Sequence, residues 1–209
     1  MPSKNDRPES FTRTARKAQI VACAIEVIAE VGYPQASIRK IADRVGIAMS
    51  AVLYHFGSKD NLVDAIVEQM YRTMLSLVVP ALAAETTASG KLNAYIRSCI
   101  KYFGTHRAAL LALTSTATNF QSLDGRRFDE LGLSPEVSGQ LAALDPLAIL
   151  AAGQNDGEFG DFPLESTAMA LQGAVNSVVE KILREPGYNA RGYGEDLVVI
   201  FGRVVGSGQ

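Results

Sequence analysis

The sequence predicts an all-α protein with about nine helices, in which a small three-helix amino-terminal domain is joined by a long helix to a larger helical domain. Three observations support this fold class. Apolar residues recur at spacings of three and four along most of the chain, residues that begin or end helices stand between these runs, and no segment alternates apolar and polar residues as a half-buried strand does. The expected domains are a disordered arm at 1–12, a helix-turn-helix domain at 13–58 and a helical domain at 59–206.

The composition is that of an ordinary globular protein. Hydrophobic residues make up 47% of the 209 residues and charged residues 20%. No uncharged apolar run is long enough to cross a bilayer, and the polar amino terminus lacks the apolar segment of a signal peptide. Cys23 and Cys99 lie within helical patterns and are expected to be free thiols of a reducing compartment. These features favour a cytoplasmic protein that makes no contact with a membrane.

Four helices are expected in the first part of the chain, at residues 13–31, 38–45, 49–55 and from 59 to at least 79. Gly32 and Gly46 follow the first two helices as carboxy-terminal caps, because glycine readily adopts the left-handed conformation found there. Ser37 and Ser58 precede the second and fourth helices as amino-terminal caps. Pro80 is expected to end or kink the fourth helix.

The remaining segments also have helical patterns, at residues 89–104, 106–120, 134–144, 145–157, 163–184 and 191–205. Two stretches, 108–123 and 166–179, lack charged residues, whereas a surface helix ordinarily has a charged face. Such a helix is either central in the core of its own chain or covered by a partner chain. For the stretch at 166–179, near the carboxyl end of the sequence, we favour a partner interface.

The helix at 49–55 has only two turns, which is too short to be stable alone or to bury much surface. It lies between a glycine-containing turn and a long helix. Residues 38–56 therefore have the layout of a helix-turn-helix, whose second helix enters the major groove of DNA. The charge distribution agrees with this interpretation, because residues 1–60 hold nine Lys and Arg against six Asp and Glu although the whole chain has a net charge of −2. Double-stranded operator DNA is the expected partner of this domain.

Three motifs in this region resemble the TetR family of transcriptional regulators. They are IVACAIEVIAEVG at 20–32, SIRKIADRVGI at 37–47 and LYHFGSKDNL at 53–62. The resemblance covers about residues 13–66 and implies a repressor that a small, mostly apolar effector releases from its operator. Ala36 and Ala48 stand where the family usually has a hydroxyl, and Leu53 stands where many members have a tyrosine.

The candidate DNA contacts lie on the short reading helix and beside it. The residues expected to face base edges are Met49, Ser50, Ala51 and Tyr54. The residues expected to meet phosphates are Arg39, His55 and Lys59. Because the reading helix has few polar side chains, apolar contact with thymine methyl groups is expected to matter more than bidentate hydrogen bonds. A solvated charge at Arg39, and packing of Tyr54 or His55 against the third helix, remain alternatives.

A homodimer is expected, since one short reading helix covers too little DNA for useful specificity. The last two helices of each subunit are predicted to form a four-helix interface. Its residues are Leu171, Ala174, Val175, Val178, Leu197, Phe201 and Val204.

The resemblance also implies a sensor domain that binds the effector. The apolar candidates for lining its pocket are Met70, Met74, Tyr95, Cys99, Phe103 and Phe120. The polar candidates for orienting the effector are Asn119, Gln172 and Asn176. For each of these residues, a plain core role is the alternative.

No catalytic residue, cofactor or metal site is expected. The two cysteines and two histidines are too scattered for metal-ligand spacing. Neither a nucleotide-binding glycine loop nor a nucleophile motif is present. A helical small-molecule-binding protein, or a helical enzyme, without DNA binding is the alternative function.

Overall fold

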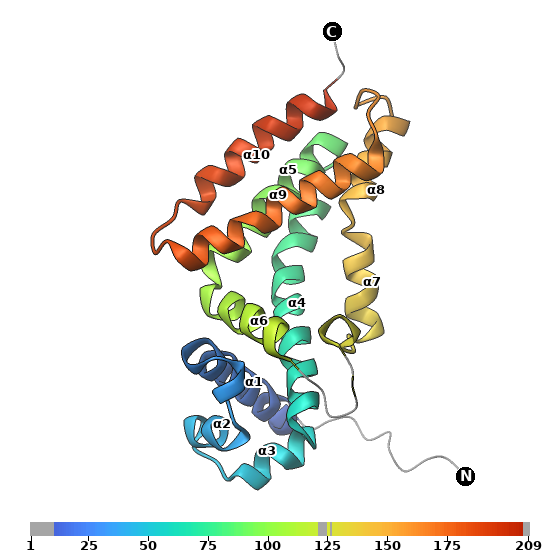
Figure 1. The fold of residues 1–209 in the computed structure, drawn as a ribbon. Helices are drawn as coiled ribbons and strands as arrows, with labels where there is room; N and C mark the ends of the chain where they lie inside the picture. Colours follow the sequence, from blue (N-terminus) through green and yellow to red (C-terminus); the bar gives the residue numbers. More distant parts are fainter. Residues whose placement is uncertain (1–10, 121–124, 126, 207–209) are drawn as a thin grey trace, which may run out of the picture. The chain divides into compact units, whose positions relative to one another are not determined.

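The computed structural model describes residues 11–120, 125 and 127–206, and within these residues the protein is built of helices and connecting segments without a strand (Figure 1). The first elements are α1 (Phe11–Val31), η1 (Tyr33–Gln35), α2 (Ile38–Val45), α3 (Met49–Phe56) and α4 (Lys59–Ala83). They are followed by α5 (Ala88–Thr105), α6 (Arg107–Asn119), η2 (Phe128–Glu130), α7 (Pro135–Ala143), α8 (Pro146–Asn155), α9 (Leu164–Arg184) and α10 (Ala190–Val205). The predicted all-α class is confirmed, with ten α-helices and two short 3-10 helices in the part of the chain that the structure describes.

The helices group into two compact units. The first contains the described residues up to Gln69 together with those of the segment 111–132, and the second contains residues 70–110 and those from Leu133 onward. This division differs from the boundary drawn at residues 58 and 59, because Leu62 and Ile66 near the start of α4 are buried with the amino-terminal helices. Both α4 and α6 therefore contribute residues to each unit.

Small and branched apolar side chains form the core of the first unit. The core residues of α1, α2 and α3 are Ile20, Ala24, Val27, Ile28, Ile41, Ala42 and Val52. Each of them is at most 3% exposed. Complete burial of an Ile or Val side chain contributes about 1.5–3 kcal/mol. Both α2 and α3 are too short to persist alone, and packing of α2 on α1 and of α3 on α2 therefore stabilises them.

The central helix of the second unit is α5. Its buried side chains occupy more than one face, and it packs against α8, α9 and α10. Burial raises the pKa of the Cys99 thiol on this helix to about 12, so the thiol stays protonated and acts as a small apolar side chain. Cys23, in the first unit, is half-buried, and both cysteines are free as expected.

Two side chains stabilise the amino end of α5. Thr87 Oγ1 accepts a hydrogen bond from the backbone N–H of Gly90 at 3.0 Å. The carboxylate of Glu158 accepts from the backbone N–H groups of Ala88 and Ser89, at 2.7 and 2.8 Å. A negative charge at this position is favoured by the helix dipole. Glu158 therefore joins the segment after α8 to the start of α5.

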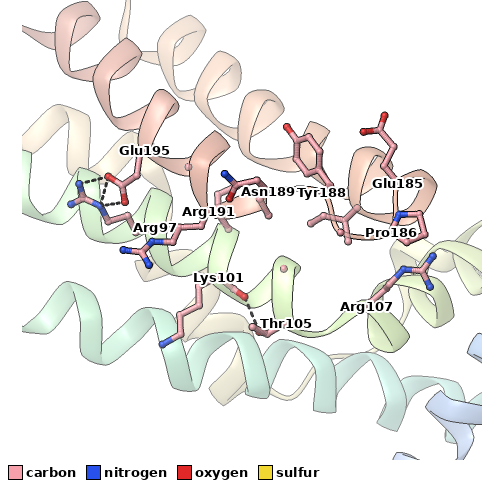
Figure 2. Close-up of a pocket in the computed structure, with 16 residues that line it drawn as sticks. Arg97, Lys101, Thr105, Arg107, Glu185, Pro186, Tyr188, Asn189, Arg191 and Glu195 are labelled. Carbon is pink, nitrogen blue, oxygen red and sulfur yellow. Dashed lines mark hydrogen bonds and ion pairs between the residues drawn. The ribbon is translucent and has the colours of Figure 1, made fainter.

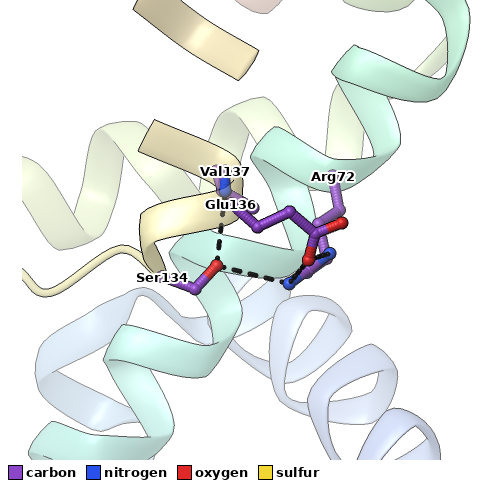
Figure 3. Close-up of polar contacts among 4 residues, drawn as sticks. All are labelled: Arg72, Ser134, Glu136 and Val137. Carbon is purple, nitrogen blue, oxygen red and sulfur yellow. Dashed lines mark hydrogen bonds and ion pairs between the residues drawn. The ribbon is translucent and has the colours of Figure 1, made fainter. Parts of the chain in front are cut away.

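Arg72 joins α4 to the start of α7 (Figure 3). Its guanidinium donates to a Glu136 carboxylate oxygen at 3.1 and 3.2 Å and to Ser134 Oγ at 3.3 Å. Ser134 is also the cap of α7, as predicted, since its Oγ accepts from the Val137 backbone N–H. The two charged side chains are 40% and 64% exposed, so this ion pair contributes only about 0–1 kcal/mol.

Three details differ from, or refine, the sequence expectations. Pro80 lies inside α4, which continues to Ala83. The uncharged stretches of α6 and α9 each expose one face within the single chain, so neither is buried on all sides. No helix of the described residues is long and apolar enough to span a membrane.

Candidate nucleic-acid interface

A tight turn separates α2 from α3. Ser37 begins α2 by accepting a hydrogen bond from the Lys40 backbone N–H at 3.2 Å. Gly46 ends the helix with φ of 76°, a left-handed conformation that favours glycine. The N–H groups of Gly46 and Ile47 both donate to the carbonyl of Ala42, at 2.9 and 3.0 Å. These hydrogen bonds close the turn of the helix-turn-helix predicted at residues 38–56.

The short helix α3 has one fully buried side chain and a broad exposed face. Val52 is 0% exposed, whereas Met49 is 50% and Tyr54 74% exposed. Ser50 and Leu53 lie on the same side, because residues three and four apart are neighbours on a helix. This face contains no charged side chain. It is therefore suited to van der Waals contact with base edges and methyl groups, with one serine hydroxyl for hydrogen bonding.

The predicted base-facing residues differ in their exposure. Met49, Ser50 and Tyr54 are exposed, and Ala51 is half-buried beside Val52. Leu53 is 37% exposed on the same face, although it was not among the predicted contacts. Leu53 lies one helical turn after Met49 and directly follows the buried Val52. This position in the sequence indicates that Leu53 shares the exposed face of Met49.

Both ends of α3 are defined by its neighbours in sequence. Ala48 precedes α3 and makes no side-chain hydrogen bond to the start of this helix, because alanine has no hydroxyl group. After α3, Gly57 has φ of 76°, and Asn61 Nδ2 donates to the Phe56 carbonyl at 2.8 Å. The backbone N–H of Asn61 donates to Ser58 Oγ at 3.1 Å, so Ser58 caps α4 as predicted. Asn61 thereby fixes the start of α4 to the end of α3.

His55 is half-buried at the end of α3. Its ring centroid lies 5.4 Å from that of Tyr54 and 6.5 Å from that of Phe56. Aromatic packing therefore accounts for part of its role, and a phosphate contact by this ring remains a prediction.

Lys59 is held by the polypeptide itself. Its Nζ lies 4.0 Å from the centroid of the Tyr33 ring and donates to the Tyr33 carbonyl at 3.2 Å. Burial lowers the pKa of Lys59, and burial also raises the pKa of the Tyr33 hydroxyl. The ammonium thus joins the segment after α1 to the start of α4, a stabilising role that the sequence did not indicate.

We expect Lys59→Ala to lower the free energy of unfolding by about 1–2 kcal/mol, because it removes a partly desolvated cation–π contact and a hydrogen bond. Thermal and urea unfolding measure this effect. If Lys59 also meets a phosphate, the same substitution reduces the salt slope of operator binding by about one per subunit.

Arg39→Ala is the matched control for that experiment, because Arg39 is exposed at the amino end of α2. It is expected to reduce the salt slope while leaving the unfolding temperature unchanged. A Lys59→Ala protein as stable as the unmutated chain would contradict the stabilising role.

A second ion pair fixes α2 on α1. The Arg44 guanidinium donates to both carboxylate oxygens of Glu30, and it lies 3.6 Å from Glu26. The hydrogen bonds from Arg44 lower the pKa of the Glu30 carboxyl. The Arg44 side chain therefore stabilises the packing of α2 on α1, whereas Arg39 is exposed and suited to bind a phosphate.

The structure brings together only some of the predicted effector-binding residues. Met70, Met74, Tyr95, Cys99 and Phe103 are all buried or half-buried in the second unit. Four of them belong to or pack against one hydrophobic core cluster, and the main-chain carbonyl of the fifth, Met70, accepts a hydrogen bond from the Tyr102 hydroxyl at 3.2 Å.

The other four predicted effector-binding residues lie elsewhere. Phe120 belongs to the first unit, where its ring centroid is 6.1 Å from that of Tyr33. Asn119 is exposed and donates to the Ser115 carbonyl. Gln172 and Asn176 are exposed on α9. The two amide side chains of α9 are thus exposed and not part of the core of their own unit, and the effector-binding role of these four residues stays a prediction.

The predicted dimer residues are mostly buried within the single chain. Five of the seven are at most 6% exposed, namely Leu171, Val175, Val178, Leu197 and Phe201. Ala174 is half-buried, and its carbonyl accepts a hydrogen bond from the Tyr193 hydroxyl at 2.8 Å. Only Val204 is exposed, at 46%. Within the single chain α9 and α10 use that face to pack on each other and on α5, and the interface role of these buried residues stays a prediction.

The same two helices carry a different apolar surface. Its exposed residues are Met169 on α9 and Val199, Ile200 and Val204 on α10. They are between 46% and 74% exposed. The described part of each helix thus has an inner apolar face, buried within the unit, and outer apolar residues exposed to solvent. We call these four exposed residues of α9 and α10 together the outer apolar face.

The fold and this interface define an all-α helix-turn-helix protein with a separate helical unit. Residues 20–66 match the sequence profile of the bacterial regulatory proteins of the tetR family. This segment of the chain therefore matches the amino-terminal domain of that family, as its motifs indicated.

Two curated relatives have the strongest bearing on the role of the protein. The chain is 31% identical over 94 residues to the HTH-type transcriptional activator FasR of Mycolicibacterium smegmatis, a match that covers 45% of this chain and 43% of FasR. It is 27% identical over 141 residues to the fatty acid metabolism regulator protein of Bacillus subtilis, covering 67% of this chain and 69% of that protein. The chain therefore spans less than half the length of FasR and about two thirds of the length of the second relative.

Solved structures with the same fold extend over nearly the whole chain. The fatty acid degradation regulator FadR of Bacillus halodurans superposes with a TM-score of 0.72, at 18% identity, covering 88% of this chain and 96% of FadR. FadR of Bacillus subtilis in complex with stearoyl-CoA gives the same TM-score, identity and coverage. At this level of identity the likeness concerns the fold.

Proposed function

We propose that this protein is a transcriptional regulator whose first unit binds operator DNA and whose second unit pairs with another copy and binds a small effector. The observation that carries the proposal is the exposed, uncharged face of α3. Met49, Leu53 and Tyr54 are large apolar or aromatic side chains left in solvent on a helix that is otherwise held firmly by its neighbours. Exposed apolar side chains contribute no burial energy to the fold of the free protein. In a DNA major groove they can contact thymine methyl groups and base edges.

A homodimer supplies the second reading helix. The outer apolar face of α9 and α10 is the surface that supports this part of the proposal, since contiguous exposed apolar residues mark interaction sites. Gly173 and Gly202 are exposed on the same two helices, and their small size permits close approach of a partner helix. Two-fold pairing through these helices gives an isologous interface, which matches a near-palindromic operator.

For the effector we propose a molecule with a long apolar chain, such as a fatty acyl thioester of coenzyme A. The relative FadR of Bacillus subtilis is described in complex with stearoyl-CoA, and a curated relative is named for fatty acid metabolism. In this chain the buried Met70, Tyr95 and Phe103 provide apolar surroundings of the kind such a chain requires. Methionine side chains are flexible enough to repack around an inserted ligand.

The link between effector and DNA in this proposal is the helix α4. It begins directly after the reading helix and continues, as one helix of 25 residues, into the second unit. An effector that favours one arrangement of α4 shifts the protein toward or away from the arrangement that fits the operator. It does so only by its difference in affinity for the two states. We propose release from DNA as the outcome, so that the protein acts as a repressor in the cytoplasm and not as an enzyme.

A gel-shift assay with DNA flanking the coding gene tests DNA binding without any effector. We expect a single specific complex that weakens steeply as salt increases, because phosphate contacts release counterions. Failure to bind any flanking fragment at micromolar protein would support the alternative of a helical small-molecule-binding protein or enzyme.

Stearoyl-CoA is expected to bind more weakly to the operator complex than to the free protein, by the same factor by which it weakens operator binding. Fluorescence titration with and without operator measures both affinities. Free coenzyme A, which lacks the apolar chain, is the control and is expected to leave the operator complex intact. Equal affinity of stearoyl-CoA for the free and DNA-bound protein would refute the coupling while leaving DNA binding itself untouched.

A further inference from the structure

The second unit contains a pocket that neither the DNA-binding role nor the apolar effector uses (Figure 2). Its volume is about 720 Å³, within the range of roughly 300–1,000 Å³ typical of small-molecule sites. It is formed by the carboxyl half of α5, the start of α6, the loop between α9 and α10, and the first turns of α10.

The floor of the pocket is apolar and its wall is rigid. Ile100, Ile182 and Ala190 line it and are each at most 7% exposed. The wall beside them is a turn containing Pro186 and Gly187. In this turn Gly187 has φ of 88°, and the backbone N–H of Tyr188 donates a hydrogen bond to the carbonyl of Glu185. This arrangement is that of a type II turn, whose conformation proline and glycine fix at little cost.

The rim of the pocket has an excess of positive charge. Its charged residues are Arg97, Lys101, Arg107, Arg191, Glu185 and Glu195. Both carboxylates are already paired. Glu195 accepts from the Arg97 guanidinium at 2.7–3.1 Å, and Glu185 forms an ion pair with Lys181 at 2.9 Å.

Three cations form no ion pair with a carboxylate among the described residues, although the charge of Arg191 adds to the Arg97 hydrogen bonds in lowering the pKa of the Glu195 carboxyl. They are Lys101, Arg107 and Arg191. Within the described residues, Arg107 alone of these three side chains forms a hydrogen bond, which it donates to the Leu183 main-chain carbonyl at 2.9 Å. Figure 2 shows Lys101 and Arg191 toward one end of the pocket, with Arg107 at the other. Three positive charges that form no ion pair lie around one cavity, and in a chain of net charge −2 this arrangement requires an explanation.

The placement of two of these cations also costs stability. Arg107 is the first residue of α6 and Arg191 the second residue of α10. The positive end of a helix dipole disfavours a cation there by about 0.3–1 kcal/mol. A bound anion would reverse the sign of this effect at both helices, because it gains from the two dipoles and from the two guanidinium groups together.

We propose that this pocket binds a multiply charged organic anion, whose phosphate or carboxylate groups meet Lys101, Arg107 and Arg191 and whose organic part lies on the floor of Ile100, Ile182 and Ala190. Arginine and lysine bind both kinds of anionic group by charge-assisted hydrogen bonds. The apolar floor selects an organic anion over an inorganic one. The site is separate from the buried residues proposed to bind an acyl chain, and it stands whether or not the protein binds DNA.

Isothermal titration calorimetry on the full chain tests the proposal with three probes. ATP carries phosphates and a flat organic part, citrate carries three carboxylates, and pyrophosphate has no organic part. We expect ATP or citrate to bind at one site per chain, and the tighter of the two identifies the anionic group. Pyrophosphate is expected to bind about tenfold more weakly than the better organic probe, since it leaves the apolar floor uncovered. Absence of binding by ATP and citrate at millimolar concentration, or pyrophosphate binding as tightly as the better organic probe, would overturn the proposal.

Substitutions locate the site. Lys101→Ala and Arg191→Ala are each expected to weaken the organic probe about tenfold, because each removes one charged hydrogen-bond donor. Lys91→Ala is the matched control, since Lys91 is exposed on α5 but does not line the pocket, and it should leave the affinity unchanged. Equal weakening by Lys91→Ala would show a general charge effect and overturn the assignment.

The charge-conserving variants Lys101→Arg and Arg191→Lys are the controls for a loss of fold in the alanine variants. They are expected to keep most of the affinity and the unfolding temperature of the unmutated chain. Loss of binding in both, with unchanged unfolding, would contradict recognition by charge.

Discussion

Ile200→Asp is expected to separate the protein into monomers in sedimentation equilibrium at micromolar concentration. Ile200 is 52% exposed on α10, in the centre of the outer apolar face with Val199 and Val204. In a two-fold dimer the substitution would bury two uncompensated carboxylates. Burying one unpaired charge costs about 3–5 kcal/mol, so the dissociation constant should rise roughly 100-fold or more.

Two comparisons make this experiment specific. Val79→Asp is the matched control, because Val79 is an exposed apolar residue of α4 outside the outer apolar face, and it should leave the dimer intact. Val175→Asp should behave differently from Ile200→Asp. Val175 is 2% exposed, so a carboxylate there should unfold the second unit and not merely separate subunits. An unmutated protein that is monomeric at micromolar concentration would refute the dimer.

Tyr54→Ala is expected to weaken operator binding about ten- to hundredfold, because it removes the most exposed aromatic side chain of the reading helix. The corresponding loss of about 1–3 kcal/mol is typical of one good contact to a base edge. Tyr54 is 74% exposed, and its described neighbours are the His55 ring and the Arg13 guanidinium, 5.9 Å from its ring centroid. The free energy of unfolding should therefore change by less than about 0.5 kcal/mol.

Tyr54→Phe distinguishes the two parts of this side chain. If the ring packs on thymine methyl groups, the phenylalanine variant keeps most of the affinity. If the hydroxyl meets a base or phosphate, both variants lose affinity alike. Gel shifts on operator and unrelated DNA measure the effect. A Tyr54→Ala protein that binds the operator as tightly as the unmutated protein would contradict the assignment of α3 as the reading helix.

The local structure of the first unit could be predicted because short-range signals agree there. Ser37, Gly46 and Ser58 occupy the cap positions expected of them. The spacing of Ile20, Ala24 and Val27 placed one face of α1 in the core. Capping and periodicity depend on residues within one or two turns, which the sequence contains in full.

The interface could not be predicted in the same way. An uncharged helix such as residues 166–179 has apolar residues on all sides, so its sequence does not distinguish the face covered by its own chain from the face left to a partner. The structure shows only that Val175 is buried within its own chain and that Met169 is exposed. Likewise, Lys59 has the signature of a phosphate contact, and only the fold shows its ammonium over the ring of Tyr33, 26 residues earlier.

The sequence by itself determined the helical class, the positions of most helix ends and the match of its first part to a DNA-binding family, because each depends on neighbouring residues and on their order. Only the tertiary structure decided which faces of α9 and α10 are free, which cations are already paired, and that Arg97, Lys101, Arg107 and Arg191 surround one pocket. These properties depend on segments that are almost 100 residues apart in the chain. Their positions in space follow from packing over the whole unit, which no local pattern encodes.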